Sequence, residues 1–472
     1  MKLRATIARF LSVASLAMVG TVASDIGDFV PQAEGATGGV VVLSVTRRGI
    51  LFDNATFHMV NITIGGNSQS AILSLDTSTS SMYVNSDCEI DFPVADYMCR
   101  KYPKYDPGAS DTSELLNPPR DRTPAKYADN VKIGNLTLEK YDFFVRTATE
   151  STQLTGRLGL AHNKDSIASD LVARGVINSN AFGFNPGLMN KTGSLIFGGI
   201  DTKKYRCHLE RFQHPVLDKD SRDRILLGVE MTGASLTLPG MPYKAFDSAS
   251  VNPYNYTYPR GIPYVTRSET VFSAFPARLF HAIGKSIPGA QYEQDAFSEQ
   301  GKSTTVDNTT FSRVGYSVPC SPSLEGTISF TFGQTTHISV PLSSFVVQQT
   351  RTLCLLAMTA TNPEDLDTYA IGSVILDDAY MAFDWANYAI WFGELDDCGS
   401  NIVPVDKGKD AFPVMDGCNC PKTEHPQDPK DDPKDEPKKD QKKGVAAPST
   451  AYLSPSSLAL VALLIAAVTL LD

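Results

Sequence analysis

The chain has 472 residues, of which 42% are hydrophobic and 20% charged, a composition typical of globular proteins and not of disordered ones. This length is enough for two or three domains. The formal net charge of −10 argues against nucleic acid as a partner, because nucleic-acid-binding surfaces carry excess Lys and Arg.

The N-terminus reads as a secretory signal peptide. Lys2, Arg4 and Arg9 precede an apolar run over residues 10–23 that is too short to span a bilayer and ends in small residues. We therefore expect a signal peptide at 1–23 and a candidate short propeptide at 24–48. The candidate propeptide ends at the dibasic pair Arg47-Arg48, which is either a proprotein cleavage site or an incidental basic pair. The folded part is expected to begin near Ile50.

Strand patterns dominate the next 350 or so residues. Residues 57–64 alternate partially between apolar and polar side chains and end at a Gly-Gly-Asn turn signal. Convincing helices are few: one over 166–174, with Gly175 as its stop, and one that begins at Pro276. Many strands with few helices indicate an all-β protein.

Two similar strand-loop frames occur about 190 residues apart. The apolar strand 71–75 leads into Asp76 and a loop of small hydroxyl residues, which can hydrogen-bond a carboxylate. The second frame runs over 263–276 and carries Arg267 where the first carries Asp76. An apolar pair followed by Gly comes later in each half, at 156–160 and at 370–376. The repeat predicts two related lobes, at 49–205 and 206–405.

The C-terminal part changes character. Residues 422–443 offer no apolar side chain to bury, so we expect 406–457 to be an extended, disordered stalk and spacer. The apolar run 458–471 ends one residue before the C-terminus, and 458–472 reads as the removable tail of a GPI signal. The candidate attachment residues are Ala446, Gly444 and Ser449; a short tail-anchored helix is the alternative.

Cysteines and glycosylation motifs also fit an oxidising, extracellular compartment. Cys88 and Cys99 could close a short loop, and Cys320 and Cys354 a longer one. The remaining four, which allow three pairings, are Cys207, Cys398, Cys418 and Cys420. Asn-x-Ser/Thr motifs stand at Asn54, Asn61, Asn135, Asn190, Asn255 and Asn308, and Asn61 is doubtful because it lies inside a strand pattern. No metal or cofactor is expected, because the His and Cys spacings form no ligand motif.

In the order and spacing of these segments, residues 50–405 resemble the pepsin family of aspartic peptidases, most closely its secreted and GPI-anchored fungal members. The resemblance implies a bilobal pepsin-like β fold with a peptide-binding cleft, where two carboxylates share a proton and activate a water. Asp76 matches the first carboxylate. The matching cleft residues are Thr77, Ser78, Ser268 and Thr270. Ser78 stands where the family has Gly, so its side chain is either tolerated or crowds the loop.

Two departures from the family bear on activity. Counting back from Pro276, the second Asp falls on Arg267, whose guanidinium has no proton to exchange and would pair with Asp76 in the place of the water. The hairpin expected to cover the cleft, near 115–127, lacks the family's Tyr and Gly-rich tip. Asp247 is an alternative second acid, and Glu269 a weaker one.

The sequence thus leaves three hypotheses. The leading one is a GPI-anchored surface protein with a pepsin-like fold and impaired catalysis, which binds a peptide or protein ligand or acts in the cell wall. The second is an active acid endopeptidase that uses Asp76 with Asp247. The third is a structural wall glycoprotein. We expect a monomer that contacts the membrane only through its lipid.

Overall fold

The computed structural model describes residues 39–49, 56–91, 93–120, 123–149, 154–188, 191–217, 225–252, 262–268, 270–294, 314–320, 324–348, 354–361, 369–408, 412–413 and 416–420. All of them belong to one compact unit. Several predictions concern residues outside these ranges: the signal peptide, the stalk beyond residue 420, the GPI signal with its attachment residue, Glu269, and the motifs at Asn54, Asn190, Asn255 and Asn308. The predicted start of the stalk at 406 is wrong, because Phe412 and Cys418 are buried and Cys418 and Cys420 form disulfides within the folded unit. No helix in the described part is both long and apolar enough to cross a membrane.

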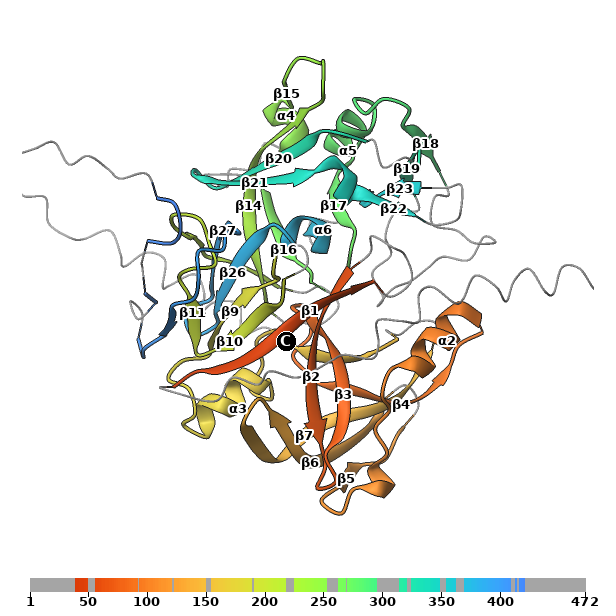
Figure 1. Cartoon of the computed structure of the whole chain (residues 1–472), viewed down its shortest axis with the longest axis vertical. Coiled ribbons are helices and arrows are strands. Elements are labelled where there is room, and N and C mark those ends of the chain that lie inside the picture. The colour runs from red at the N-terminus through yellow and green to blue at the C-terminus, as the bar shows by residue number, and fades with distance from the viewer. Residues whose placement is uncertain are drawn as a thin grey trace, which may run out of the picture. The chain divides into compact units, whose positions relative to one another are not determined.

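A sheet of 13 described strands forms the first lobe and continues between the lobes (Figure 1). In spatial order the strands are β12 (Glu210–Phe212), β27 (Ala389–Glu394), β26 (Ala379–Asp384), β9 (Ala181–Asn185), β10 (Gly193–Phe197), β1 (Val41–Gly49), β2 (Thr56–Ile64), β3 (Gln69–Asp76), β8 (Gly156–Gly159), β4 (Tyr83–Glu89), β7 (Leu136–Thr149), β6 (Ala125–Ile133) and β5 (Glu114–Asn117). Strand β26 comes from the second half of the chain but pairs with β9 from the first, so the two halves share this sheet.

The second lobe is built on a nine-stranded sheet among the described residues, at the top of Figure 1. It contains β21 (Thr336–Pro341), β20 (Thr327–Phe332), β14 (Ile225–Thr237), β16 (Ile262–Thr266), β25 (Ala370–Ile371), β17 (Ser273–Pro276) and β24 (Met358–Thr361), with β13 (His214–Leu217) and β15 (Lys244–Ala245) paired to β14. Smaller sheets contain β18 (Gln291–Glu293), β19 (Gly315–Val318), β23 (Cys354–Leu356) and β22 (Val346–Gln348), and β11 (Gly199–Asp201) with β28 (Ile402–Pro404).

Short helices connect the strands, and the two predicted ones are confirmed. The helices are α2 (Pro93–Lys101), α3 (Ile167–Ala173), α4 (Ser248–Val251), α5 (Ala277–Gly284) and α6 (Ser373–Leu376), with 3₁₀ turns at Pro107–Ala109 and Leu342–Phe345. Helix α3 begins after Ser166, whose side chain accepts a hydrogen bond from Ser169 N and caps the helix. Helix α5 buries Leu279, Phe280 and Ile283 on one face. The predicted all-β, two-lobed architecture is thus confirmed.

The start of the folded region was predicted wrongly. Strand β1 places residues 41–48 in the shared sheet, between β10 and β2, whereas we expected them in a propeptide and the fold to begin near Ile50. Val41, Leu43 and Val45 are buried there. Arg47, half of the dibasic pair, forms an ion pair with Asp377 at 3.4 Å and donates to Pro186 O. The apolar residues of β1 are buried only because β10, from later in the chain, pairs with β1.

Disulfides join loops that are distant in sequence. The structure contains Cys88–Cys99 and Cys320–Cys354, and it pairs the remaining four cysteines as Cys207–Cys420 and Cys398–Cys418. The last two hold the C-terminal end of the described region against the segment after β11 and against the connection between β27 and β28.

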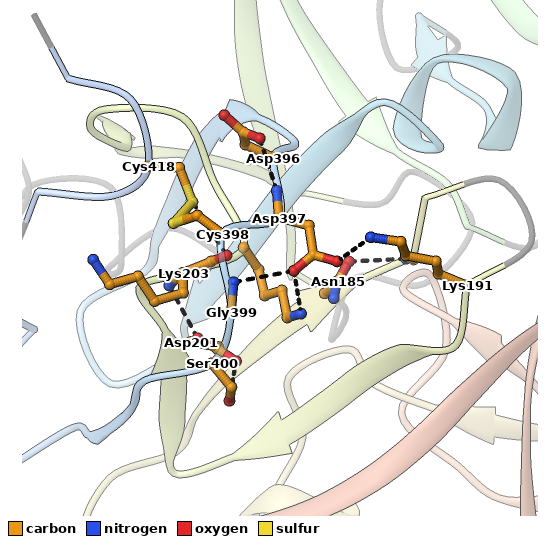
Figure 2. A network of polar contacts seen from close by, with 12 residues as sticks. Asn185, Lys191, Asp201, Lys203, Asp396, Asp397, Cys398, Gly399, Ser400 and Cys418 are labelled. Carbon is orange, nitrogen blue, oxygen red and sulfur yellow. Dashed lines mark hydrogen bonds and ion pairs between the residues drawn. A yellow bond between two sulfur atoms is a disulfide. The ribbon is translucent and has the colours of Figure 1, made fainter.

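Charged residues support the same corner of the molecule (Figure 2). The carboxylate of Asp397 contacts Lys191 Nζ at 2.8 Å and Lys204 Nζ at 2.7 Å, while Asp201 accepts from Ser400 Oγ at 2.7 Å. Burial raises the pKa of Asp397, but the hydrogen bonds from the two lysines outweigh it and lower that pKa to about 2.

Candidate active site

Asp76 lies at the C-terminal end of β3 and is fully buried. Its Oδ1 accepts hydrogen bonds from Ser78 N and Ser78 Oγ, both at 2.7 Å, and from Thr79 N at 3.1 Å. The loop of small hydroxyl residues therefore holds the carboxylate as the sequence predicts. Ser78, which replaces the glycine of the resemblance, does not crowd the loop, because its hydroxyl supplies one of these donors.

The other oxygen of Asp76 faces an arginine. Arg157 Nη1 lies 2.9 Å from Asp76 Oδ2, and the two side chains are 8% and 0% exposed. Strand β8 delivers Arg157, because it runs parallel to β3 with Arg157 beside Ser74 and Gly159 beside Asp76. The contact is an ion pair without hydrogen-bond geometry, since Oδ2 accepts no hydrogen bond from the described residues.

The two frames are joined by a reciprocal set of hydrogen bonds. Thr77 Oγ1 donates to Thr266 O at 2.7 Å, and Ser268 Oγ donates to Leu75 O at 3.0 Å. Ser268 N donates to Thr77 Oγ1 at 3.2 Å, and Thr77 N donates to Ser268 Oγ at 3.3 Å. The Thr77 hydroxyl thus donates to the carbonyl two residues before Ser268, and the Ser268 hydroxyl donates to the carbonyl two residues before Thr77. An approximate two-fold axis therefore relates Thr77 to Ser268. The same axis relates Asp76 to Arg267.

Two glycines show the same correspondence between the loop at Asp76 and the loop at Arg267. A Cβ on Gly159 would lie 2.5 Å from the carbonyl carbon of Ser80, four residues after Asp76. A Cβ on Gly372 would lie 2.5 Å from the carbonyl oxygen of Val271, four residues after Arg267. Both glycines therefore permit the close backbone approach that each loop needs. The apolar-pair-and-Gly repeat in the sequence reflects this shared geometry.

The second loop keeps its frame without a carboxylate at the related position. Arg267 is half-buried, and its N–H donates to Ile371 O at 2.9 Å. Ser268 is buried, and Thr270 O accepts from Ser373 N at 2.7 Å. The ion pair that we expected between Arg267 and Asp76 is replaced by the pair with Arg157. The expectation failed because the side chain opposite Asp76 comes from the neighbouring strand of the same lobe.

Asp247, the alternative second acid, lies outside this site. It is exposed and caps helix α4, and its Oδ1 accepts from Ser250 N at 2.6 Å. Hydrogen bonds from Ser250 lower the pKa of Asp247. It is a surface helix cap and not a partner of Asp76.

A hairpin forms in the region expected to cover the cleft. Strands β5 and β6 pair antiparallel, with Leu115 beside Tyr127, and Arg120 forms a further bridge with Thr123. Leu115 is 51% exposed. The hairpin therefore exists although its sequence departs from the family's Tyr-Gly pattern.

The two interlocked loops, with an aspartate on one, agree with the resemblance to aspartic peptidases. Residues 57–395 match the family model described as eukaryotic aspartyl protease. The chain belongs to this family. A probable aspartic-type endopeptidase opsB of Aspergillus oryzae is 24% identical over 394 residues, which cover 77% of this chain and 74% of the relative. Candidapepsin-2 of Candida parapsilosis is 23% identical, covering 68% and 71%. Secreted aspartic protease 3 of Candida albicans is 25% identical, covering 71% and 78%.

Sequence reasoning missed the role of Arg157. Its segment, residues 156–160, was recognised as a family motif, but the charge inside it was not used. A charged residue in an otherwise apolar segment needs a partner when it is buried, and the only signal was this mismatch. Its partner could not be named without the pairing of β8 with β3.

Proposed function

We propose that this member of the aspartyl protease family is a cell-surface protein with little or no peptidase activity, whose cleft binds a peptide. The observation that carries the proposal is the reciprocal hydrogen bonding of Thr77 and Ser268, because it relates Arg267 to Asp76 and leaves the dyad with one carboxylate.

The chemistry of peptide hydrolysis explains why one carboxylate is not enough. An ionised carboxylate takes a proton from water while the water oxygen adds to the peptide carbonyl carbon, and the second acid protonates the carbonyl oxygen. The intermediate then collapses: the first carboxyl group gives the proton that it took from water to the nitrogen, the C–N bond breaks, and the second carboxylate takes a proton back from a hydroxyl of the intermediate. Arg267 cannot act as that second acid, because a guanidinium does not give up its proton at working pH. Loss of one acid-base group reduces the rate by roughly 10²–10⁴-fold.

The proposed location rests on the sequence ends and on the relatives. The signal-peptide pattern at 1–23 and the GPI-signal pattern at 458–472 favour export and lipid attachment. Four disulfides within the described region suit an oxidising compartment. A similar protein of Candida albicans is named a secreted aspartic protease. In this proposal the part of the predicted stalk that follows Cys420, residues 421–457, separates the folded part from the membrane or wall.

Digestion of a denatured protein at acid pH tests the loss of activity. The purified chain and its Asp76→Ala variant are incubated with substrate, with and without a statine-containing peptide that mimics the transition state. We expect the two proteins to give the same background. Cleavage that the statine peptide inhibits and that Asp76→Ala abolishes would refute the proposal.

Calorimetric titration with the same statine peptide tests the binding role separately. Measurable binding supports a peptide-binding cleft. If no binding is detected, the peptide-binding part of the proposal is wrong and a structural role in the wall is favoured. The variant Asp247→Asn is the matched control in both assays, because it changes an exposed acid that caps α4.

A further inference from the structure

We infer that Arg157 is a second and separate obstacle to catalysis: its guanidinium holds the oxygen of Asp76 that a catalytic dyad would use. Restoring an acid at position 267 would then leave the site inactive while Arg157 remains. This inference rests on the proposed function, since it concerns why the site of this chain does not cleave peptides.

The hydrogen bonds of Asp76 divide its two oxygens between different partners. Oδ1 is occupied by three donors from the loop, two from Ser78 and one from Thr79. Oδ2 is therefore the oxygen left for a water or a shared proton, and it lies 2.9 Å from Arg157 Nη1. A second carboxylate placed near Oδ2 would meet this guanidinium before it could share a proton with Asp76.

Burial makes the pair persistent. Both side chains are less than a tenth exposed, so neither charge can exchange its partner for water. Moving one partner of a buried ion pair leaves the other charge uncompensated, which is strongly unfavourable. Arg157 is thus a positioning residue that acts on Asp76.

The fold itself does not require a charge at this position. The two-fold axis relates Arg157, which lies beside Ser74, to Ala370, which lies beside Val265. Ala370 is 1% exposed and stands two residues before Gly372, as Arg157 stands two residues before Gly159. A neutral apolar side chain therefore occupies the equivalent place in the second lobe. Methionine at 157 would keep most of the length of arginine without its charge.

The test uses three variants at acid pH: R267D, R157M/R267D and R157K/R267D. We expect R267D to stay at the wild-type background and R157M/R267D to cleave a denatured protein at least about 10²-fold faster, with inhibition by the statine peptide. R157K/R267D keeps a cation of similar reach, so we expect it to stay near background. A merely structural role for Arg157 would not separate Met from Lys in this direction.

Each outcome decides the inference independently of the proposed function. Statine-inhibited cleavage by R267D alone would show that Arg157 does not obstruct Asp76, and this arm leaves the buried pair intact. Failure of a folded R157M/R267D to cleave or to bind the statine peptide would also refute it. Near-UV circular dichroism establishes folding, and if the Met variant does not fold, R157A/R267D, which carries the side chain of the equivalent Ala370, takes its place with the same expected result. Cleavage by the wild-type chain, in contrast, refutes the proposed function.

Discussion

Asp378 offers a direct test of how acid pH stabilises the fold. It follows α6 and precedes β26, and only part of its side chain reaches solvent. Burial and the nearby carboxylates of Asp377 and Glu394 raise the pKa of Asp378 to about 7, against the opposing effect of Arg47. Asp377 itself accepts a hydrogen bond from the buried His58 at 2.7 Å. A neutral side chain at 378 is therefore favoured in the folded chain.

The sign and size of the effect follow from linkage. The folded pKa of Asp378 is about 7 and its ordinary value is 3.8. The folded state, which favours the protonated Asp378, is therefore stabilised fully below about pH 4, and this stabilisation is lost as the pH rises through 7. A pKa difference of one corresponds to about 1.4 kcal/mol, which gives about 4 kcal/mol, and the partly exposed carboxylate reduces this to about 2–3 kcal/mol. Asp378→Asn keeps the neutral form at every pH.

We expect Asp378→Asn to raise the free energy of unfolding by about 2–3 kcal/mol at pH 8 and to change it little at pH 4. Urea denaturation followed by tryptophan fluorescence at pH 4, 6 and 8 measures this difference. Asp406→Asn is the matched control, because Asp406 is exposed. An equal change at pH 4 and pH 8, or destabilisation at pH 8, would refute the reasoning.

Three further predictions concern the supports of the fold and its modification. Glu210 accepts from Gln334 N and Thr335 N, and these bonds outweigh burial and lower its pKa. Glu210→Gln should therefore lower the free energy of unfolding, measured by urea denaturation, by about 1–3 kcal/mol at pH 7 and by less as the pH falls below 4.5. An equal loss at both pH values would contradict this. Thr77→Val should lose about 1–3 kcal/mol in the same assay, because it removes two of the four hydrogen bonds that join the loops, and an unchanged midpoint would contradict it. Asn135→Gln should increase electrophoretic mobility because Asn135 is an exposed turn residue, whereas Asn61→Gln should not, because Asn61 Oδ1 accepts from Ser70 Oγ within the sheet.

Local patterns were sufficient for the fold class and for the frame of the site. The Ser166 cap and the apolar face of α5 are short-range signals, and both helices form where they were predicted. The count back from Pro276 places Arg267 at the position in the second loop that Asp76 has in the first, and the hydrogen bonds between Thr77 and Ser268 give the same correspondence. These features depend on spacing along the chain, which a sequence displays directly.

Long-range pairings could not be read in the same way. The partner of Asp76 depends on the parallel register of β8 with β3, which places Arg157 within 2.9 Å although 81 residues separate the two. Strand β1 depends on β10, about 150 residues later, and so its residues resembled a loose leader. The Cys207–Cys420 disulfide spans a sequence separation of 213, and nothing in the local sequence excludes the other pairings.

The frame of the site and the chemistry of the site have different physical bases here. Backbone groups and two hydroxyls hold the loops together, through Thr77, Ser268 and the N–H of Arg267, and none of these bonds needs an acid at position 267. An arginine can therefore replace a catalytic aspartate without disturbing the fold. Catalysis, in contrast, depends on two side chains that the frame leaves free to vary. The family match over residues 57–395 reports the frame. In our proposal, the two guanidinium groups at Arg157 and Arg267 are what prevent this frame from cleaving peptides.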